Sequence, residues 1–279
     1  MAVYVTGAAG FLGRATVLAL AASGFEVVAV TRAAAVFPVD VRHQSVRDYG
    51  EIETGGDDVL IHLAETPLVA EAQARGDIHL SDTRAGMERL LSLGWGHVVY
   101  ASSAVVYGDA VMRPRREVET VDPRDIYGRA KRACEVLILN TGGAVARFAN
   151  LIGPGMAHGT VLSDILDQIA TAGPLRLRDV TPVRDFLDVR DAAEGIVAIV
   201  RRSASGIFNF GSGQGISIGD LADLVLTAAH ERGRPVVATA PAGRTSHLVL
   251  DIGTSDRKLG WRPTVPLDRT IAALLRKTS

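Results

Sequence analysis

The alternation of short apolar runs with longer amphipathic segments limits the fold of this chain more than any other feature. Apolar residues fill successive positions in each run, as expected for strands covered on both faces. The segments between the runs have apolar residues at the spacing of an amphipathic helix. The predicted strands are Val3–Thr6, Glu26–Thr31, Asp58–Ala64, His97–Ser102 and Gly143–Phe148, and the predicted helices are Phe11–Ala22, Thr83–Leu93 and Tyr127–Asn140. This order predicts an α/β fold with a doubly wound parallel sheet of the Rossmann type.

The character of the sequence changes near residue 150, after which loops rich in Gly and Pro separate shorter elements. We expect a Rossmann-type domain over residues 1–150 and a smaller α/β lobe over 151–279, with part of 183–212 returning to the first domain. A length of 279 residues allows about two domains. In the second part we predict a strand at 206–212 and helices at 217–230 and 268–277.

The balance of charged side chains excludes partners that are bound through the electrostatic field of a large net charge. Thirty basic and 31 acidic side chains leave a formal net charge of -1, so we expect neither a nucleic acid nor a membrane as partner. Cys134 is the single cysteine, and it fits a reducing compartment. No apolar run reaches the roughly 18 residues that span a bilayer. We therefore expect a cytoplasmic protein. We expect no metal site, because the histidines do not have the spacing of metal ligands.

A glycine-rich turn directly follows the first predicted strand and opens the first predicted helix. Backbone N–H groups there could approach a dinucleotide pyrophosphate at the positive end of a helix, because glycine has no Cβ in the way. The alternative is a turn that serves only tight packing. The predicted cofactor residues of this turn are Gly7, Ala9, Gly10, Phe11, Leu12 and Gly13.

The second predicted strand ends in Val30-Thr31-Arg32, where an NAD site usually offers a carboxylate to the ribose. Arg32 can instead pair with a 2′-phosphate. This favours NADP(H) as the cofactor, while NAD(H) stays open and Arg32 could also be a solvated loop residue.

Tyr127 and Lys131 stand four residues apart on a predicted helix, so they share one face. A phenol that exchanges a proton near neutrality needs help, and an adjacent ammonium favours its phenolate. The strand before that helix ends in Ser102-Ser103, whose hydroxyls would lie at the carboxyl edge of the sheet, where ligands bind. The alternatives are an exposed helix pair and a serine turn.

Taken together, TGAAGFLG, DVLIHLAE, YASSAVVYGD and YGRAK resemble the extended short-chain dehydrogenase/reductase family, which contains NAD(P)-dependent epimerases, dehydratases and reductases. The resemblance implies that Ser103 is the catalytic serine, Tyr127 the acid/base, and Lys131 the residue that assists Tyr127 and holds the nicotinamide ribose. It places Asp40 and Val41, after a short third strand, near adenine. It also places Leu63 and Ala64 along the cofactor groove.

The second lobe is similar to that of nucleotide-sugar enzymes. By that resemblance Asn150 meets the diphosphate or sugar, and Arg184 and Arg244 bind the phosphates. Two arginines suit bidentate recognition of such an anion. The structural alternative pairs these arginines with Asp185 or Asp188 and with Asp251.

The resemblance implies a nucleotide-sugar substrate and a homodimer. Ala104 and Val105 replace the acidic pair that follows the catalytic hydroxyl in 4,6-dehydratases, so we do not expect that reaction. With Arg32, the sequence favours a 4-keto-sugar reductase slightly over a 4-epimerase. A reductase of a non-sugar carbonyl and a non-catalytic NADP-binding protein stay open. Two departures from the family pattern are Thr83, where Asn is common, and Glu65, where a small residue is usual.

Overall fold

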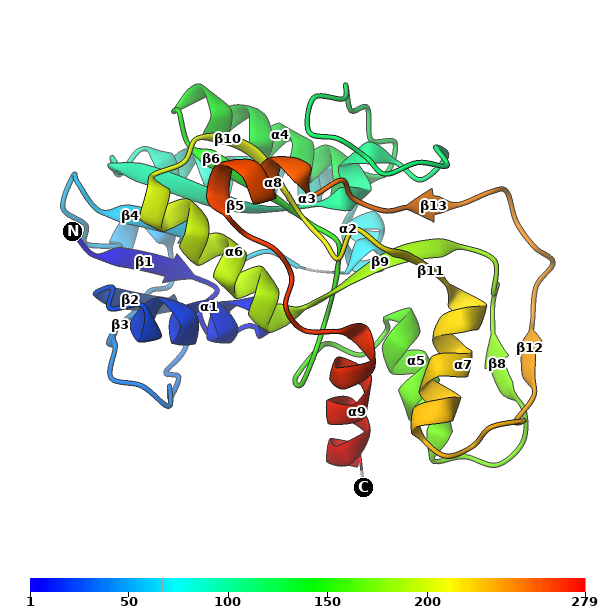
Figure 1. Cartoon of the computed structure of the whole chain (residues 1–279). Coiled ribbons are helices and arrows are strands. Elements are labelled where there is room, and N and C mark those ends of the chain that lie inside the picture. Colours follow the sequence, from blue (N-terminus) through cyan, green and yellow to red (C-terminus); the bar gives the residue numbers. More distant parts are fainter. Residues whose placement is uncertain (67, 279) are drawn as a thin grey trace.

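The centre of the molecule is a parallel seven-stranded sheet with the order β10-β6-β5-β4-β1-β2-β3 (Figure 1). The structure is a computed structural model that describes residues 1–66 and 68–278. From β1 the chain builds outward through β2 and β3, and β4 then returns to the other side of β1. This reversal makes the carboxyl ends of β1 and β4 the point where a ligand crevice is expected. The strands are β1 (Val3–Thr6), β2 (Val27–Thr31), β3 (Arg42–Ser45), β4 (Val59–His62), β5 (His97–Ser103), β6 (Ala144–Phe148) and β10 (Gly206–Phe210).

Helices cover both faces of this sheet, which confirms the doubly wound α/β prediction (Figure 1). On one face α1 (Phe11–Ala22) packs against α6 (Val189–Arg202). On the other, α3 (Asp77–Leu91) packs against α4 (Ile126–Asn140), with α2 (Val69–Arg75) beside α4. Each face has its own buried apolar cluster. The remaining helical turns near this sheet are the 3₁₀ segments η1 (Tyr49–Glu51) and η2 (Ala104–Tyr107).

The predicted elements of the first half are all present. The helix expected at Thr83–Leu93 begins six residues earlier, at Asp77, and ends at Leu91. Its first two turns contain only two apolar side chains, Ile78 and Leu80, of which Ile78 is exposed, so they carry little apolar periodicity. The 206–212 strand and the helices at 217–230 and 268–277 are also present, as β10, α7 (Ile218–Ala228) and α9 (Leu267–Thr278).

The second part of the chain forms a smaller sheet and a separate apolar cluster. In this sheet β9 (Val183–Asp188) lies between β11 (Gly215–Ser217) and β13 (His247–Leu248), and it also pairs with β7 (Asn150–Ile152). A separate pair joins β8 (Leu175–Leu177) to β12 (Val236–Ala238). The helices are α5 (Val161–Ile169), α7 (Ile218–Ala228), α8 (Gly253–Leu259) and α9 (Leu267–Thr278). The division at residue 150 stays a prediction, although β10 does join the large sheet. No helix within the described residues is long and apolar enough to cross a membrane.

Candidate active site

The turn between β1 and α1 is packed so closely that it has no space for side chains at Gly7 and Gly13. Gly7 has φ +68°, and a Cβ there would lie 2.8–2.9 Å from the backbone of Leu63 and Ala64. A Cβ at Gly13 would lie 2.0 Å from the carbonyl oxygen of Gly7. Gly10 caps α1 without a side-chain hydrogen bond. The turn thus presents the helix N-terminus without a side-chain cap, an arrangement that fits a dinucleotide pyrophosphate.

The other predicted cofactor residues of the turn lie around it. Ala9 is exposed, and its carbonyl oxygen accepts a hydrogen bond from Arg14. Phe11 and Leu12 are partly buried in the first turn of α1. Leu63 and Ala64 follow β4 and touch the turn directly, since the Leu63 amide donates to the Thr6 carbonyl over 3.3 Å. The structure therefore brings these predicted residues together at the switch point of the sheet.

The residues predicted to bind the adenosine part of the cofactor lie at opposite edges of the sheet. Arg32 follows β2 at the carboxyl edge of the sheet, where its side chain is exposed. Asp40 and Val41 precede β3 instead of following it, so their predicted placement after the third strand is wrong. Arg42 of β3 pairs with Val28, near the beginning of β2. Asp40 and Val41 therefore lie toward the amino edge of a parallel sheet, away from its ligand edge.

The two serines that end β5 have different environments. Ser102 is buried and its hydroxyl donates to the Glu135 carboxylate over 2.7 Å. Ser103 is only partly buried, and its Oγ accepts a hydrogen bond from the Val105 amide over 3.3 Å. Among the residues that the structure describes, no group accepts the Ser103 proton, so it can be donated to a ligand. This difference favours Ser103, as predicted, over Ser102.

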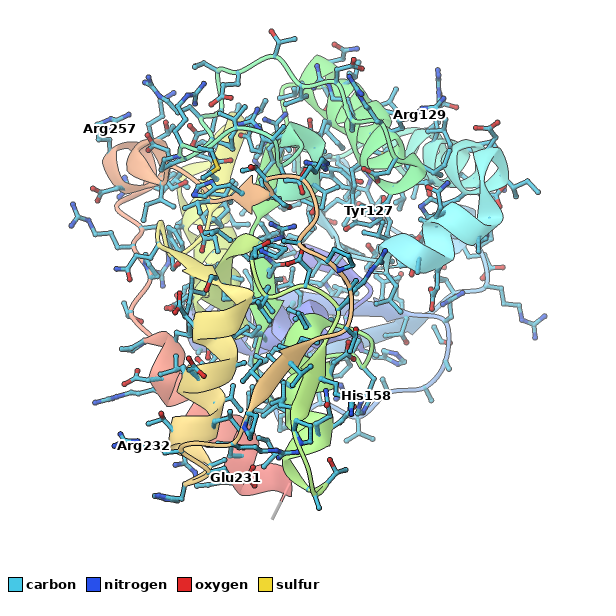
Figure 2. The ribbon with its side chains drawn as sticks, turned by 90° about the vertical axis from the view of Figure 1, so that its right-hand side faces the viewer. Tyr127, Arg129, His158, Glu231, Arg232 and Arg257 are labelled. Carbon is cyan, nitrogen blue, oxygen red and sulfur yellow. The ribbon has the colours of Figure 1, made fainter. Side chains whose placement is uncertain are left out.

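Tyr127 and Lys131 share the face of α4 that covers the end of β5. The Lys131 ammonium lies 5.7 Å from the centre of the Tyr127 ring and donates to the Ala101 carbonyl oxygen over 2.8 Å. Figure 2 shows Tyr127 near the centre of the face that α2, α4 and α5 surround. Among the described residues no group hydrogen-bonds the Tyr127 hydroxyl, and its oxygen is not completely buried. The hydroxyl is thus open to a proton partner.

Glu65 connects the glycine turn to this pair. It follows Ala64, which touches Gly7, and its carboxylate lies 2.7 Å from the Lys131 ammonium. The sequence marked Glu65 only as a departure from the family pattern and assigned it no role. Its contacts show that the turn and the Tyr127–Lys131 pair belong to one site.

Arg184 and Arg244 converge on one carboxylate, that of Asp109. Arg244 donates to Asp109 over 2.6 Å, and Arg184 lies 3.4 Å from the same carboxylate and donates to Ser246 over 2.7 Å. Burial opposes ionisation of Asp109, but hydrogen bonds from Ser246 and Arg244 outweigh it and lower its pKa. Two guanidinium groups thus form a local cationic site in a chain of almost no net charge.

The remaining residue predicted to bind substrate also lies on this small sheet. Asn150, at the start of β7, donates to the carbonyl oxygen of Asp185 over 2.9 Å and is exposed. Asp185 immediately follows Arg184 on β9. Asp109 follows η2, which itself follows Ser103, so a short segment connects the serine to the two arginines. The sequence missed Asp109 and Ser246, although Asp109 ends the quoted motif YASSAVVYGD.

The alternative in which Arg184 and Arg244 pair with nearby aspartates for structural reasons names the wrong aspartates. Asp185 accepts hydrogen bonds from backbone amides and from Ser212. Asp188 pairs with Arg190, and Asp251 lies 3.9 Å from Arg116. None of these carboxylates takes Arg184 or Arg244, whose ion-pair partner within the described residues is Asp109.

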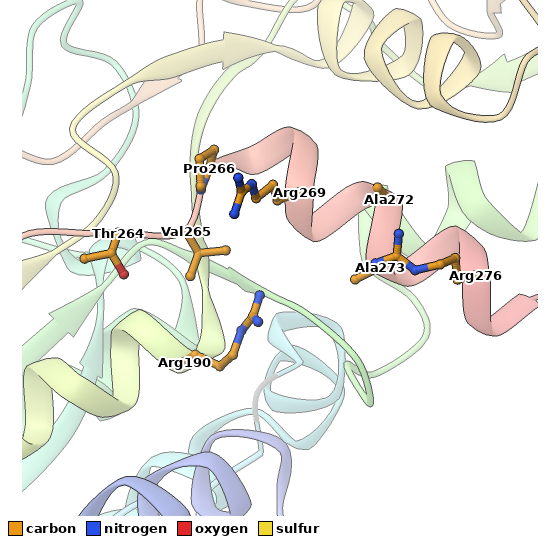
Figure 3. Close-up of a pocket in the computed structure, with 8 residues that line it drawn as sticks. All are labelled: Arg190, Thr264, Val265, Pro266, Arg269, Ala272, Ala273 and Arg276. Carbon is orange, nitrogen blue, oxygen red and sulfur yellow. The ribbon is translucent and has the colours of Figure 1, made fainter.

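A shallow depression elsewhere on the surface lies between α6 and α9 and is lined by Arg190, Arg269 and Arg276 (Figure 3). Arg190 is engaged by Asp188 there. None of the predicted catalytic residues lines this depression. This depression therefore lies apart from the predicted catalytic residues.

A tyrosine and a lysine beside a phosphate-binding turn are the arrangement of enzymes that transfer hydride to or from nicotinamide, the short-chain dehydrogenases/reductases. A sequence model of the NAD dependent epimerase/dehydratase family matches residues 3–211. The chain therefore belongs to this family, and it is an enzyme of the extended short-chain dehydrogenase/reductase type.

Individual relatives are similar to this protein in sequence or structure over nearly the whole chain. A UDP-glucose 4-epimerase of Halalkalibacterium halodurans is 26% identical, covering 95% of this chain and 92% of the relative. The structure of MoeE5 in complex with UDP-glucose and NAD has a TM-score of 0.85 and 26% identity, covering 100% of this chain and 98% of that one. RMD from Pseudomonas aeruginosa complexed with NADPH has a TM-score of 0.84 and 27% identity, covering 98% and 97%.

Proposed function

We propose that this enzyme is an NAD(P)-dependent nucleotide-sugar 4-epimerase that works through Ser103, Tyr127 and Lys131. The observation that carries the proposal is the Tyr127–Lys131 pair beside the strand that ends in Ser103. Asp109, which pairs with Arg184 and Arg244, lies six residues after Ser103. The relative from H. halodurans is named a UDP-glucose 4-epimerase, which supports epimerisation over the reductase that the sequence favoured.

The side chains divide the chemistry among them. Nicotinamide, when bound, supplies hydride acceptance and hydride return at a sugar carbon. With Lys131 favouring its phenolate form, Tyr127 takes the proton from the sugar hydroxyl during oxidation and returns it during reduction. Among the described residues no group hydrogen-bonds the Tyr127 oxygen in competition. Ser103 donates a hydrogen bond to the same sugar oxygen. Arg184 and Arg244 hold the diphosphate while the keto-sugar turns to present its other face.

A reductase of a nucleotide-bound 4-keto sugar is the second candidate, and Arg32 is the observation that favours it. Arg32 stands at the carboxyl end of β2, where a carboxylate would bind the adenosine ribose of NAD. An exposed guanidinium there suits the 2′-phosphate of NADP(H). A reductase releases oxidised cofactor at each turnover, whereas an epimerase keeps its cofactor.

The proposed function predicts which cofactor leaves the purified protein. We expect mass spectrometry of the denatured enzyme to detect NAD(H), and the enzyme to interconvert UDP-glucose and UDP-galactose without net oxidation of added NADPH. An empty site that oxidises NADPH only with a nucleotide-bound 4-keto sugar would instead establish the reductase. An enzyme that is inactive on both substrate classes would contradict the proposed function.

The same assay with Arg184→Gln tests the anion site. Removing one guanidinium should raise KM for the nucleotide sugar by about 10-fold or more, since charge-assisted hydrogen bonds contribute about 1.5–3 kcal/mol. Arg190→Gln is the matched control, because Arg190 pairs with Asp188 outside the site. An unchanged KM in Arg184→Gln would favour a substrate without a diphosphate.

The cofactor preference predicts a selective effect at Arg32. If Arg32 binds the 2′-phosphate, Arg32→Ala should weaken NADPH binding about 10-fold or more while changing NADH binding little. Isothermal titration with each cofactor measures both affinities. Equal losses for the two cofactors would remove the 2′-phosphate interpretation.

We further propose that the protein is a homodimer that pairs through α3 and α4. Ile78 on α3 and Val136 on α4 expose 64% and 42% of their surfaces, respectively. Both helices lie on the same face of the large sheet, and a second copy could cover these apolar side chains.

A further inference from the structure

The Lys131 ammonium is buried, and its counter-charge comes from Glu65. The side chains of Lys131 and Glu65 are only 9% and 10% exposed, and 2.7 Å separates Nζ from the carboxylate. A second hydrogen bond, to the carbonyl oxygen of Ala101, leaves one of the three ammonium donors unused. Within the described residues Glu65 is the side chain that forms an ion pair with Lys131.

Glu65 is itself held from two neighbouring strands. The Tyr100 hydroxyl of β5 lies 3.0 Å from both carboxylate oxygens. His62 of β4 lies 3.7 Å away, and its other ring nitrogen is 2.7 Å from the Thr6 hydroxyl. Burial alone would raise the pKa of Glu65, but Lys131 and His62 outweigh burial and lower it to about 2. The carboxylate is therefore charged throughout the neutral range.

A buried ammonium without a counter-charge tends to lose its proton, because burial disfavours the charged form. Burial does act in this direction on Lys131, but the Glu65 carboxylate and, to a smaller extent, Tyr127 together outweigh it, so the pKa of Lys131 lies above its usual range. The Ala101 carbonyl is neutral and cannot replace that charge. Lys131 thus depends on Glu65 for the charge that assists Tyr127.

We propose that Glu65 is a positioning residue, which fixes the Lys131 ammonium beside Tyr127 and keeps it protonated in its buried site. The inference rests on the proposed function for its catalytic meaning, because it acts through Lys131. It gives a role to the residue that departs from the family pattern, and it makes the Tyr127–Lys131 pair a group of three.

Other titratable groups surround the pair, and the test must separate them from Glu65. They come from every element packed against Lys131 or Glu65: His62 on β4, Tyr100 on β5, Tyr127 and Cys134 on α4, His79 on α3, Arg75 on α2 and Tyr49 on η1. Of these, Arg75 is positively charged, and His62 and His79 would be if protonated; a nearby positive charge opposes protonation of Lys131.

The test is a titration of the lysines by NMR in protein labelled with ¹³C at the lysine ε-carbon. The chain has only three lysines, and Lys131→Arg identifies the signal of Lys131. In the wild-type protein Lys131 should titrate at or above the pH of exposed Lys258. In Glu65→Gln, which keeps the size of the side chain, the midpoint of Lys131 should fall by about 1–3 pH units. The alkaline limb of kcat should move to lower pH by a similar amount.

Controls make this result specific. Glu88→Gln removes a carboxylate that pairs with Arg84 on the exposed face of α3 and should leave the Lys131 signal unchanged. Glu65→Asp, which retains the charge on a shorter side chain, should give an intermediate shift and also serves if Glu65→Gln does not fold. An unchanged midpoint in the Glu65 variants would overturn the proposal. The titration needs no substrate. A shifted midpoint in a protein without epimerase activity would therefore contradict the proposed function and still support the role of Glu65.

Discussion

Replacing Tyr127 with phenylalanine is expected to lower kcat by about 10²–10⁴-fold, the usual contribution of a positioned acid/base. The buried ring, which is only 8% exposed, would keep its packing and its place 5.7 Å from Lys131. Only the hydroxyl that exchanges the proton is lost. Cofactor affinity, measured by isothermal titration, should therefore stay within about 2-fold, because no described contact of the glycine turn changes.

A tyrosine whose hydroxyl is hydrogen-bonded away from Tyr127 and Lys131 provides the matched control. Tyr4 lies on β1 and its hydroxyl donates to the Glu53 carbonyl over 2.8 Å, so Tyr4→Phe also removes one phenolic oxygen. Its kcat should stay close to that of the wild-type enzyme. Turnover near the wild-type level in Tyr127→Phe would exclude Tyr127 from the proton transfer and would leave the site without its acid/base.

The parts of the fold and site that could be predicted from sequence depend on local patterns. The ends of β1 and of α1 agree with the prediction, because a fully buried strand and an amphipathic helix meet at glycines with little room for a Cβ. Tyr127 and Lys131 could be paired because a spacing of four residues places them on one face of a helix. Both signals lie within a few residues of sequence.

The errors and omissions come from segments without such a pattern. Strand β3 has the sequence RHQS, is mostly exposed at the edge of the sheet, and lacks the apolar run that marks the other strands. Asp40 and Val41 were therefore placed on the wrong side of it. The carboxylate that joins the two arginines could not be predicted either, because Asp109 is 75 residues from Arg184 and 135 from Arg244.

Replacing Arg147 with methionine is expected to lower the free energy of unfolding by about 3 kcal/mol, at the lower end of the usual cost of breaking a buried ion pair. Arg147 and Glu135 are 1% and 0% exposed, and two hydrogen bonds of 2.8 and 2.7 Å join them. The variant leaves the Glu135 carboxylate buried with Arg132, at 3.2 Å, as its remaining cation. Urea denaturation followed by circular dichroism measures the loss.

The double variant Arg147→Met/Glu135→Leu separates lost packing from an uncompensated charge. Removing both charges should restore part of the stability lost in Arg147→Met, because apolar side chains can replace a buried pair at little cost. A double variant less stable than either single one would contradict this account. Activity adds a second readout, since Glu135 lies one turn beyond Lys131 on α4 and binds Ser102, the neighbour of Ser103. If the ion pair aligns α4 with β5, kcat should fall in Arg147→Met even where the protein is fully folded, and it should stay low in the double variant, which also lacks the pair.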